Sequence, residues 1–307
     1  MDIFFSSYQL KPRSNLNAKS SAVLRSGALI KVAESDFFGV ADLFTWPEFG
    51  DDEWQVEIKS NSNLFKRSLE LAQHDLEARK EKRSLLKNVA VKNNLLILDF
   101  EKEKIENTIV KIKANYDIEK LAQVINTQEA KYRIDFNSIL SVDEMDEFLN
   151  LLSPKGLKRI EYIEDPTVWN NLDWDRWNKI VPLAIDWSTL DPFAEPSTWP
   201  TLVVKPSRQN AEGLLKQAQK LNKKLTVTSS MGHPVGIMHD LSWVQNQLNA
   251  EGVHGLMTLN VYEDTPFHKY FLTKESLLQS TSENLKQSGL GMTEALNQLS
   301  WKNIREL

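Results

Sequence analysis

The stretch TIVKIKANYDIEKLAQVINTQEAKYRIDFN, residues 108–137, holds two short apolar runs with a helical pattern between them. The first run, TIVKIKA (108–114), and the last, YRIDFN (132–137), are rich in the β-branched and aromatic residues that favour strands. Residues 117–128 between them carry apolar side chains at helical spacing. A strand, a helix and a second strand in this order predict one unit of a parallel α/β sheet.

Similar apolar runs recur along the chain from about residue 95 to residue 260. The eight runs are LLILDF (95–100), TIVKIKA (108–114), YRIDFN (132–137), RIEYIED (159–165), PLAIDWS (182–188), TLVVKPS (201–207), LTVTSS (225–230) and GLMTLN (255–260). Helices are predicted over 117–128, after a capping box of Ser141 and Glu144, over 208–222 and over 234–250. Eight strands with helices between them predict an α/β fold in the form of a closed parallel barrel. About seven residues separate the first two runs, which is short for a parallel crossover.

Residues 1 to about 90 have a different pattern and predict a small α+β domain. Runs rich in β-branched and aromatic residues at about 3–9, 22–33 and 37–46 indicate an antiparallel meander, and residues 63–86 place leucines near helical spacing. We therefore divide the chain into a domain of residues 1–90 and a barrel of residues 91–284. Residues 285–307 are expected to pack back on the first domain.

The composition excludes several classes of function. The 307 residues contain no cysteine, which excludes disulfides, thiolate metal sites and cysteine nucleophiles. The 11 glycines form neither GxGxxG nor GxxxxGK[ST], so a glycine-rich phosphate loop is excluded. A net charge of −5 without a basic block disfavours nucleic acid as a partner, and no apolar run is long enough to span a membrane. The expected location is the cytoplasm, and the oligomeric state is not predicted.

Charged or amide side chains lie at or near the carboxyl ends of five successive predicted strands. They are Lys111 and Lys113, Asp135 and Asn137, Glu164 and Asp165, Asp186, and Lys205. Barrel enzymes build their sites at this end of the strands. A single acid after a strand is usually a turn former or a helix cap, but three in order, Asp135, Glu164 and Asp186, would project into one cavity and repel one another unless a cation is present. Oxygen ligands without His or Cys predict Mg²⁺, with Mn²⁺ as a substitute.

The lysines form the complementary half of the predicted site. Lys111 and Lys113 are two residues apart and point to the same side of their strand, while Lys205 would face them across the cavity. Neighbouring ammonium groups are expected to lower each other's pKa and to bring Lys113 toward the range of a general base. A divalent cation between opposed lysines suits removal of a proton from the carbon next to a carboxylate.

These motifs resemble the enolase superfamily and, within its muconate-lactonizing-enzyme-like group, the o-succinylbenzoate synthase family. The matching pieces are KIK (111–113), RIDFN (133–137), YIEDP (162–166), AIDWS (184–188) and VVKPS (203–207). The segment FGVADLFTWPEFGD (38–51) resembles the capping domain of that family. The resemblance implies a modified TIM barrel of the (β/α)7β type with an N-terminal α+β capping domain.

The resemblance also implies an activity. The chain would be a Mg²⁺-dependent lyase of menaquinone biosynthesis that dehydrates the small carboxylate 2-succinyl-6-hydroxy-2,4-cyclohexadiene-1-carboxylate to 2-succinylbenzoate. Asp135, Glu164 and Asp186 would hold the metal. Lys113 would remove the proton and then protonate the departing hydroxyl, and Lys205 would stabilise the intermediate from the opposite face. Lys111 would tune Lys113, and Asn137 and Asp165 would orient the ligands.

The sequence departs from the superfamily pattern at one position of this site, and it also indicates which residues could determine specificity. The residue after the third metal ligand is usually acidic in the superfamily, and here it is Trp187. Specificity is expected from the loops at about 14–25 and 45–51 and from the ends of the seventh and eighth strands. Arg25, Ser229, Ser230 and Met231 are the candidates for contacting the succinyl group or the ring, although Arg25 also fits an ordinary surface arginine.

Three other interpretations remain. A racemase or epimerase of N-acylamino acids or dipeptides would share the fold and the lysines, but the eighth run, HGLMTLN (254–260), lacks an acidic pair for a substrate ammonium. A non-catalytic barrel used for binding would have to retain a costly cluster of buried charges. A histidine-based hydrolase is disfavoured because the five histidines show neither an HExxH nor a GxSxG context.

Overall fold

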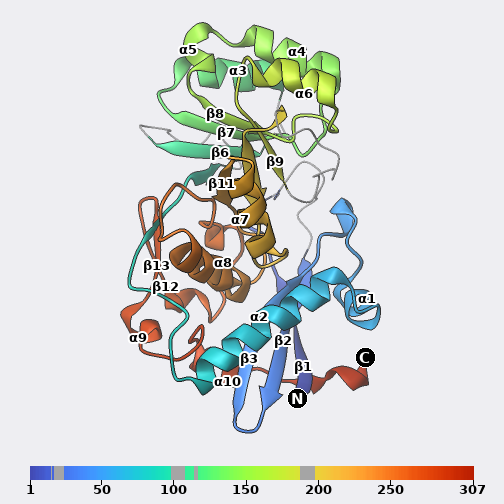
Figure 1. The fold of residues 1–307 in the computed structure, drawn as a ribbon, viewed down its shortest axis with the longest axis vertical. Coiled ribbons are helices and arrows are strands. Elements are labelled where there is room, and N and C mark those ends of the chain that lie inside the picture. Colours follow the sequence, from blue (N-terminus) through green and yellow to red (C-terminus); the bar gives the residue numbers. More distant parts are fainter. Residues whose placement is uncertain (15, 17–23, 98–107, 114–116, 187–197) are drawn as a thin grey trace.

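The structure is a computed structural model, and it describes residues 1–14, 16, 24–97, 108–113, 117–186 and 198–307. An antiparallel sheet with two helices forms one end of the molecule, and a curled parallel sheet with its own helices forms the other (Figure 1). Three predictions from the sequence fall wholly or largely outside the described residues: the short connection at 101–107, the departure at Trp187 and most of the specificity loop at about 14–25.

The antiparallel unit, which we call the cap, contains the predicted meander and the long helix. Its elements are β1 (Asp2–Leu10), β2 (Arg25–Glu34), β3 (Phe37–Phe44), β14 (Lys302–Asn303), α1 (Trp54–Lys59) and α2 (Asn63–Lys80). The Ser62 side chain caps α2 by accepting a hydrogen bond from Phe65 N, and α2 packs on β2 and β3. Gly39 allows this approach, because a Cβ there would lie 2.0 Å from the Ala72 carbonyl oxygen.

Seven strands of the predicted barrel form one parallel sheet in the order β11-β10-β9-β8-β7-β6-β5. They are β5 (Leu95–Ile97), β6 (Ile109–Lys113), β7 (Lys131–Asp135), β8 (Ile160–Glu164), β9 (Leu183–Asp186), β10 (Thr201–Val204) and β11 (Lys224–Val227). The helices are α3 (Ile118–Thr127), α4 (Val142–Leu151), α5 (Pro154–Leu157), α6 (Asn171–Asn178), α7 (Ala211–Lys220) and α8 (Pro234–Gln247). The predicted capping box of Ser141 and Glu144 begins α4.

Residues 254 and 255 close this sheet through one bridge on each side. His254 bridges Asn93, which precedes β5, and Gly255 bridges Thr228, which follows β11. His254 N donates to the Lys92 carbonyl at 2.9 Å, and Gly255 N donates to the Val227 carbonyl at 2.8 Å. We call these two bridges the seam of the barrel.

The prediction of a regular eighth strand over 255–260 is wrong. A 3₁₀ helix occupies Leu259–Val261. At the seam, side chains accept hydrogen bonds from backbone N–H groups that would bond to backbone carbonyls in a regular strand ladder. The Asn93 side-chain oxygen accepts from Leu256 N at 2.8 Å, and His254 Nδ1 accepts from Val227 N at 3.2 Å. Burial lowers the pKa of His254 to about 4, so the neutral ring that this bond requires persists at neutral pH.

The C-terminal part of the chain returns to the cap. A small antiparallel sheet, β12-β13-β4, is formed by β12 (Phe271–Lys274), β13 (Leu277–Ser280) and β4 (Val91–Lys92). The short helices α9 (Ser282–Leu285) and α10 (Thr293–Asn297) follow, and β14 then pairs with β1. The side chain of Lys31 in β2 lies 4.6 Å from the ring centre of Trp301. The division of the chain at residues 90 and 284 stays a prediction.

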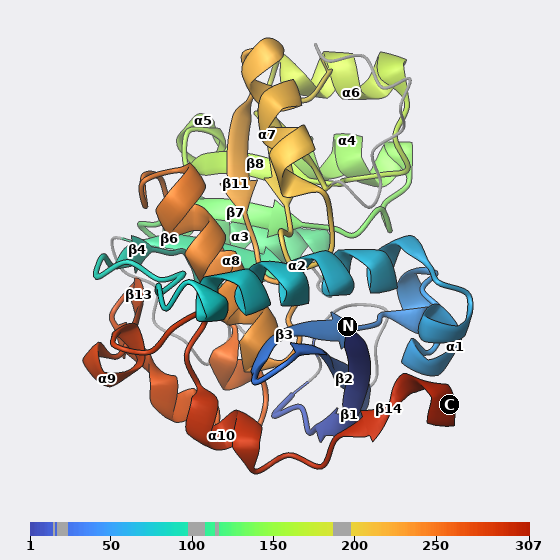
Figure 2. The same ribbon diagram turned by 60° about the horizontal axis from the view of Figure 1, so that its bottom comes forward.

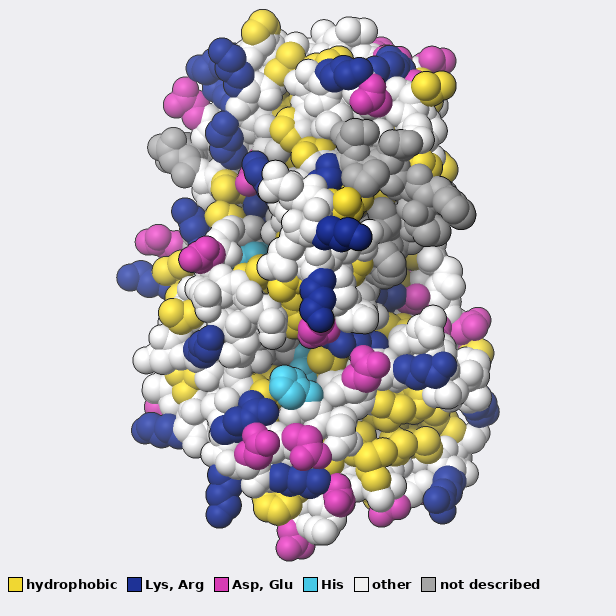
Figure 3. Space-filling view, viewed as in Figure 1, with side chains coloured by type: hydrophobic (Ala, Val, Ile, Leu, Met, Phe, Trp, Pro, Cys, Tyr) yellow, Lys and Arg dark blue, Asp and Glu magenta, His cyan; other side chains and the backbone are white. Residues whose placement is uncertain are grey.

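The cap packs against the helices that follow β10 and β11. Helix α2 crosses in front of α8 when the molecule is turned (Figure 2). His239 of α8 lies 2.8 Å from the Val40 carbonyl oxygen of β3, and Arg67 of α2 donates to the Pro206 carbonyl oxygen at 2.9 Å. Basic and acidic side chains are interspersed over the face in Figure 3. Among the described residues, no helix is long and apolar enough to cross a membrane.

Candidate active site

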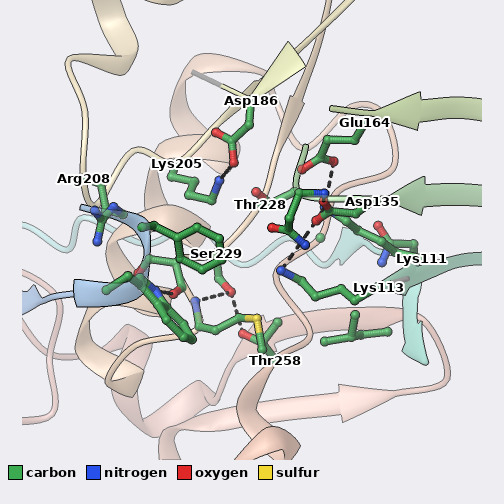
Figure 4. Close-up of a pocket in the computed structure, with 18 of the residues that line it drawn as sticks. Lys111, Lys113, Asp135, Glu164, Asp186, Lys205, Arg208, Thr228, Ser229 and Thr258 are labelled. Atoms are coloured by element: carbon green, nitrogen blue, oxygen red, sulfur yellow. Dashed lines mark hydrogen bonds and ion pairs between the residues drawn. The ribbon is translucent and has the colours of Figure 1, made fainter. Parts of the chain in front are cut away.

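A pocket lies where the carboxyl ends of the parallel strands face the cap. Its wall combines charged strand-end residues, polar loop residues and cap aromatics: Trp46, Phe49, Asp51, Asn94, Leu96, Lys111, Lys113, Asp135, Asn137, Glu164, Asp186, Lys205, Arg208, Gln209, Thr228, Ser229, Ser230, Met231, Gly255, Met257 and Thr258. The ionisable groups that the sequence places at strand ends line this pocket, with Asp165 as the exception. Figure 4 shows Lys113 and Lys205 on different sides of it.

The register of the sheet explains why these side chains meet. Lys113 pairs with Asp135 across β6 and β7, and Asp135 pairs with Glu164 across β7 and β8. Residues that are paired in a parallel sheet point to the same face, so all three side chains enter the barrel interior in one row. Asp186 ends β9, and Lys205 directly follows β10.

Lys111 binds two of the three carboxylates. Its Nζ lies 2.7 Å from Glu164 Oε2 and 3.0 Å from Asp135 Oδ2, and the side chain is buried. Burial alone would lower the pKa of Lys111, but the two carboxylates outweigh it and raise the pKa. The expectation that Lys111 and Lys113 lower each other's pKa is therefore wrong for Lys111, because it considered only the two ammonium groups and not the two carboxylates that Lys111 contacts.

The Asp135 carboxylate lies close to both lysines of β6. Lys113 Nζ lies 3.5 Å from Asp135 Oδ2, the oxygen that Lys111 also approaches. Burial would raise the pKa of Asp135, but the two ammonium groups outweigh it and hold the pKa below its usual range. Asp135 is thus ionised at neutral pH although it is buried.

Lys205 forms the other charged pair of the pocket. Its Nζ contacts Asp186 Oδ2. Burial lowers the pKa of Lys205 to about 7, Glu164 opposes this shift, and the ammonium groups of Lys111 and Lys113 add to it.

The predicted metal ligands share one pocket, but they are not gathered around a single point. Among the described residues, no group of three or more His, Asp or Glu side chains has the arrangement of a metal site. Lys111 holds Asp135 and Glu164, and Lys205 holds Asp186, so each carboxylate has an ammonium partner. The donor set itself, three carboxylates on adjacent strands, matches the oxygen ligands that Mg²⁺ prefers.

Each of the two predicted supporting residues makes a hydrogen bond to a predicted metal ligand, Asn137 to the carboxylate of Asp135 and Asp165 to the backbone of Asp186. Asn137 N donates to Asp135 Oδ1 at 3.1 Å, and the side chain of Asn137 lines the pocket. Asp165 Oδ1 accepts from Asp186 N at 3.1 Å from outside the pocket wall. Both residues have positive φ, 50° for Asn137 and 41° for Asp165, a region that such residues adopt at a small cost.

Among the predicted specificity residues, three lie on the pocket wall and one does not. Ser229, Ser230 and Met231 are buried and line the pocket. Arg25 stands behind Trp46, with its guanidinium 4.6 Å from that ring centre and its Nη1 donating to Glu48 at 2.9 Å. This position does not favour a direct contact between Arg25 and a ligand.

Arg208 is a pocket residue that the sequence analysis missed. Its Nη2 donates to the two carboxylate oxygens of Asp51 at 2.9 and 2.7 Å, and its Nη1 donates to the Phe44 carbonyl oxygen at 2.9 Å. The arginine thereby fixes the cap loop against the barrel. The sequence predicts that Arg208 begins the helix over 208–222, and this prediction gives no sign that its side chain contacts the cap.

Two buried carboxyl groups lie behind the pocket wall. Asp42 of β3 accepts from Tyr8 Oη at 2.5 Å and from His233 N at 2.9 Å. Asp240 of α8 accepts from Ser207 N at 2.7 Å and from Ser207 Oγ at 3.2 Å. Burial raises the pKa of Asp42 to about 7 and that of Asp240 to about 8.

Sequence comparison agrees with this geometry. Residues 3–78 match the family model described as O-succinylbenzoate synthase, N-terminal domain. The o-succinylbenzoate synthase of Bdellovibrio bacteriovorus is 30% identical over 331 aligned positions, which cover 99% of this chain and 98% of that protein. The chain belongs to the o-succinylbenzoate synthase family.

Solved structures show that this member of the o-succinylbenzoate synthase family has the enolase-superfamily fold. A dipeptide epimerase from Cytophaga hutchinsonii, complexed with Mg and the dipeptide D-Ala-L-Val, superposes with a TM-score of 0.77 at 14% identity, covering 99% of both chains. A muconate lactonizing enzyme from Pseudomonas fluorescens, complexed with muconolactone, has a TM-score of 0.73 at 15% identity, covering 98% of this chain and 96% of the other. The predicted barrel with a capping domain is confirmed.

Proposed function

We propose that this chain catalyses the dehydration of 2-succinyl-6-hydroxy-2,4-cyclohexadiene-1-carboxylate to 2-succinylbenzoate. The observation that carries the proposal is the placement of Lys113 and Lys205 on different sides of one pocket, with three carboxylates between their strands. Membership of the o-succinylbenzoate synthase family supports the substrate. The activity is that of a lyase, because a C–O bond breaks without hydrolysis.

Lys113 is the proposed acid and base. Its amine would take the proton from the ring carbon that bears the carboxylate, and the electron pair of that C–H bond would move toward the carboxylate. The C–O bond to the ring hydroxyl then breaks, and the same proton leaves with the hydroxide as water. Lys113 is thereby restored, and the ring becomes aromatic.

Lys205 and Lys111 would supply charge and not proton transfer. Lys205 would place its ammonium group against the negative charge that develops on the substrate. Lys111 is held by Asp135 and Glu164 and keeps its proton, since these carboxylates raise its pKa. Lys111 would thus keep a fixed positive charge next to Lys113.

Asp135, Glu164 and Asp186 are the proposed Mg²⁺ ligands, with Mn²⁺ as a substitute. The bound cation would neutralise the charge on the substrate carboxylate and so acidify the neighbouring C–H group. Asn137 and Asp165 would orient these ligands through the bonds to Asp135 and to the backbone of Asp186.

Turnover of the purified chain tests the proposal. With the diene and Mg²⁺ present, loss of the diene absorbance should be rapid, and Lys113→Ala should reduce kcat by about 10²- to 10⁴-fold because the general base is lost. EDTA should abolish turnover, and added Mg²⁺ should restore it. Lys155→Ala is a matched control, since the Lys155 side chain is 70% exposed and lies outside the pocket lining.

Some outcomes would overturn parts of this scheme. Absence of turnover in the unmodified chain would remove the function, and equal rates in Lys113→Ala and Lys155→Ala would remove the base. A second activity, racemization of an N-acylamino acid, is supported by the lysines on different sides of the pocket. Exchange of the α-proton in D₂O, without loss of water, would reveal it.

A further inference from the structure

Thr228 carries a buried hydroxyl group at the wall of the pocket. It directly follows β11, lines the pocket, and is 4% exposed. Its Oγ1 has no hydrogen-bond partner among the described residues. Asn137 Nδ2 shares this property within the pocket, but Asn137 lies beside Asp135, which accepts a hydrogen bond from the Asn137 backbone N, and so belongs to the part of the pocket proposed to hold the metal.

The backbone of Thr228 fixes its place beside Lys205. Thr228 N donates to the Val204 carbonyl oxygen at 2.9 Å, and Val204 immediately precedes Lys205. The ring of strand-end groups that begins with Lys113 and Asp135 therefore continues past Lys205 to Thr228. In Figure 4 Thr228 lies between Lys205 and Lys113.

The seam of the barrel holds the Thr228 side chain in one orientation. A Cβ on Gly255 would lie 2.9 Å from Thr228 Cγ2, so the methyl group faces Gly255 and the hydroxyl group is the other branch. The glycine leaves the space that this orientation needs. The next residue, Ser229, is different, because its hydroxyl is paired with Thr258 Oγ1 at 2.6 Å.

A buried hydroxyl without a partner lowers the stability of the free protein, so a ligand that pairs with it gains affinity. We propose that Thr228 Oγ1 binds an oxygen of the succinyl arm of the substrate, an inference that rests on the proposed function. The reacting carboxylate belongs beside Lys113 and the three carboxylates. Thr228 instead adjoins Ser229, Ser230 and Met231, which line the same pocket, and a neutral hydroxyl can pair with a keto or carboxylate oxygen there.

Binding of the product tests this assignment. In the presence of Mg²⁺, calorimetry with 2-succinylbenzoate should give a Kd about 3- to 10-fold higher for Thr228→Val than for the unmodified chain, the cost of one neutral hydrogen bond. Thr228→Ser, which keeps the hydroxyl, should restore most of the affinity. Benzoate, which has the ring carboxylate without the arm, should bind both proteins equally. The melting temperature of ligand-free Thr228→Val should equal or exceed that of the unmodified chain.

Thr226→Val is the matched control, since Thr226 lies two residues earlier on β11, is buried, and is outside the pocket lining. Its Kd should not change. Three results would each overturn the assignment: an unchanged Kd in Thr228→Val, a loss of affinity that Thr228→Ser does not restore, or an equal loss of affinity for benzoate. None of these results would contradict the proposed function, which is tested by diene turnover of the unmodified chain. Failure of the unmodified chain to turn over the diene would instead overturn the proposed function and, with it, the identity of the arm.

Discussion

Carboxyl groups are buried in two regions of this molecule, and their pKa values shift in opposite directions in the two regions. In the pocket, Asp135 meets the ammonium groups of Lys111 and Lys113, and its pKa is held below the usual range. Behind the pocket wall, Asp42 and Asp240 accept hydrogen bonds from hydroxyl and backbone N–H donors, and arginine charges contribute less than burial to their pKa values. Burial raises the pKa of these two groups to about 7 and about 8.

The difference shows that burial depth does not decide whether a carboxyl group is ionised. All three residues are at most 4% exposed. A nearby ammonium group compensates the lost hydration of a carboxylate, whereas neutral donors compensate it only in part. The pocket therefore keeps ionised carboxylates, as the proposed cation site requires, and the acids in the wall behind it accept hydrogen bonds from the backbone of His233 and Ser207.

Removing the ammonium group of Lys111 should have the largest effect on stability. Lys111→Met leaves Asp135 and Glu164 buried with Lys113 as the remaining close cation, at 3.5 Å from Asp135. The loss of one partner of a buried ion pair should lower the free energy of unfolding by about 3–5 kcal/mol. Urea denaturation at pH 7 without divalent ions measures it. Lys155→Met is the control, and equal stability of the two variants would show that the pocket charges do not depend on Lys111.

The second prediction concerns pH and Asp240. The folded-state pKa is about 8 and the unfolded value is 3.8, so between these values the folded state retains a proton that the unfolded state has lost. The contribution of Asp240 to stability therefore falls as the pH rises from about 4 to about 8, by at most about 1.4 kcal/mol per pH unit. Asp135 contributes the opposite sign, because its stabilisation is lost only on acidification below its unfolded pKa of 3.8.

Asp240→Asn separates these contributions. The amide keeps an oxygen for Ser207 N and can donate to Ser207 Oγ, so the fold should persist. Urea midpoints at pH 5, 6, 7 and 8 should show that the variant gains stability relative to the unmodified chain as the pH rises. Asp36→Asn, on the exposed turn between β2 and β3, should show no such trend. A constant difference for Asp240→Asn would mean that Asp240 is ionised throughout.

The smallest expected effect comes from Tyr8. Tyr8→Phe removes the 2.5 Å hydrogen bond to Asp42 but leaves the bond from His233 N. The free energy of unfolding should fall by about 1 to 2 kcal/mol at pH 8, where Asp42 is ionised. Tyr132→Phe is the comparison, since the Tyr132 hydroxyl lies 3.4 Å from the Gln128 carbonyl oxygen and forms a weaker bond. An equal loss in both variants would contradict a special role for the Asp42 pair.

The sequence predicted the pocket better than it predicted the wall behind it. Charges such as Lys113 and Glu164 stand out at the ends of apolar strands, and strand order brings them together. Asp42, inside the apolar stretch FGVADLF, gave the same signal, yet its partners Tyr8 and His233 are 34 and 191 residues away. No local pattern encodes pairings at such distances.

Two errors have the same physical origin. The bond lengths between Lys111 and its two carboxylates, which reverse the expected direction of its pKa, depend on the register of three strands. The expected strand at 255–260 fails because side chains of Asn93 and His254 supply hydrogen bonds at the seam. Residue type alone does not show when a side chain will replace a backbone group.

The barrel wall is joined by strand ladders in one part and by the single bridges of the seam in another. The strands that carry Lys113, Asp135 and Glu164 are joined by ladders of several residue pairs, and these three residues pair across the ladders, so their spacing is fixed by the sheet. The wall beside Thr228 is joined to the first strand through single bridges at His254 and Gly255. Substitutions there can widen or narrow the ligand space while the spacing of the reactive groups stays the same. The fold can thus change the shape that it accepts without rebuilding the chemistry that it performs.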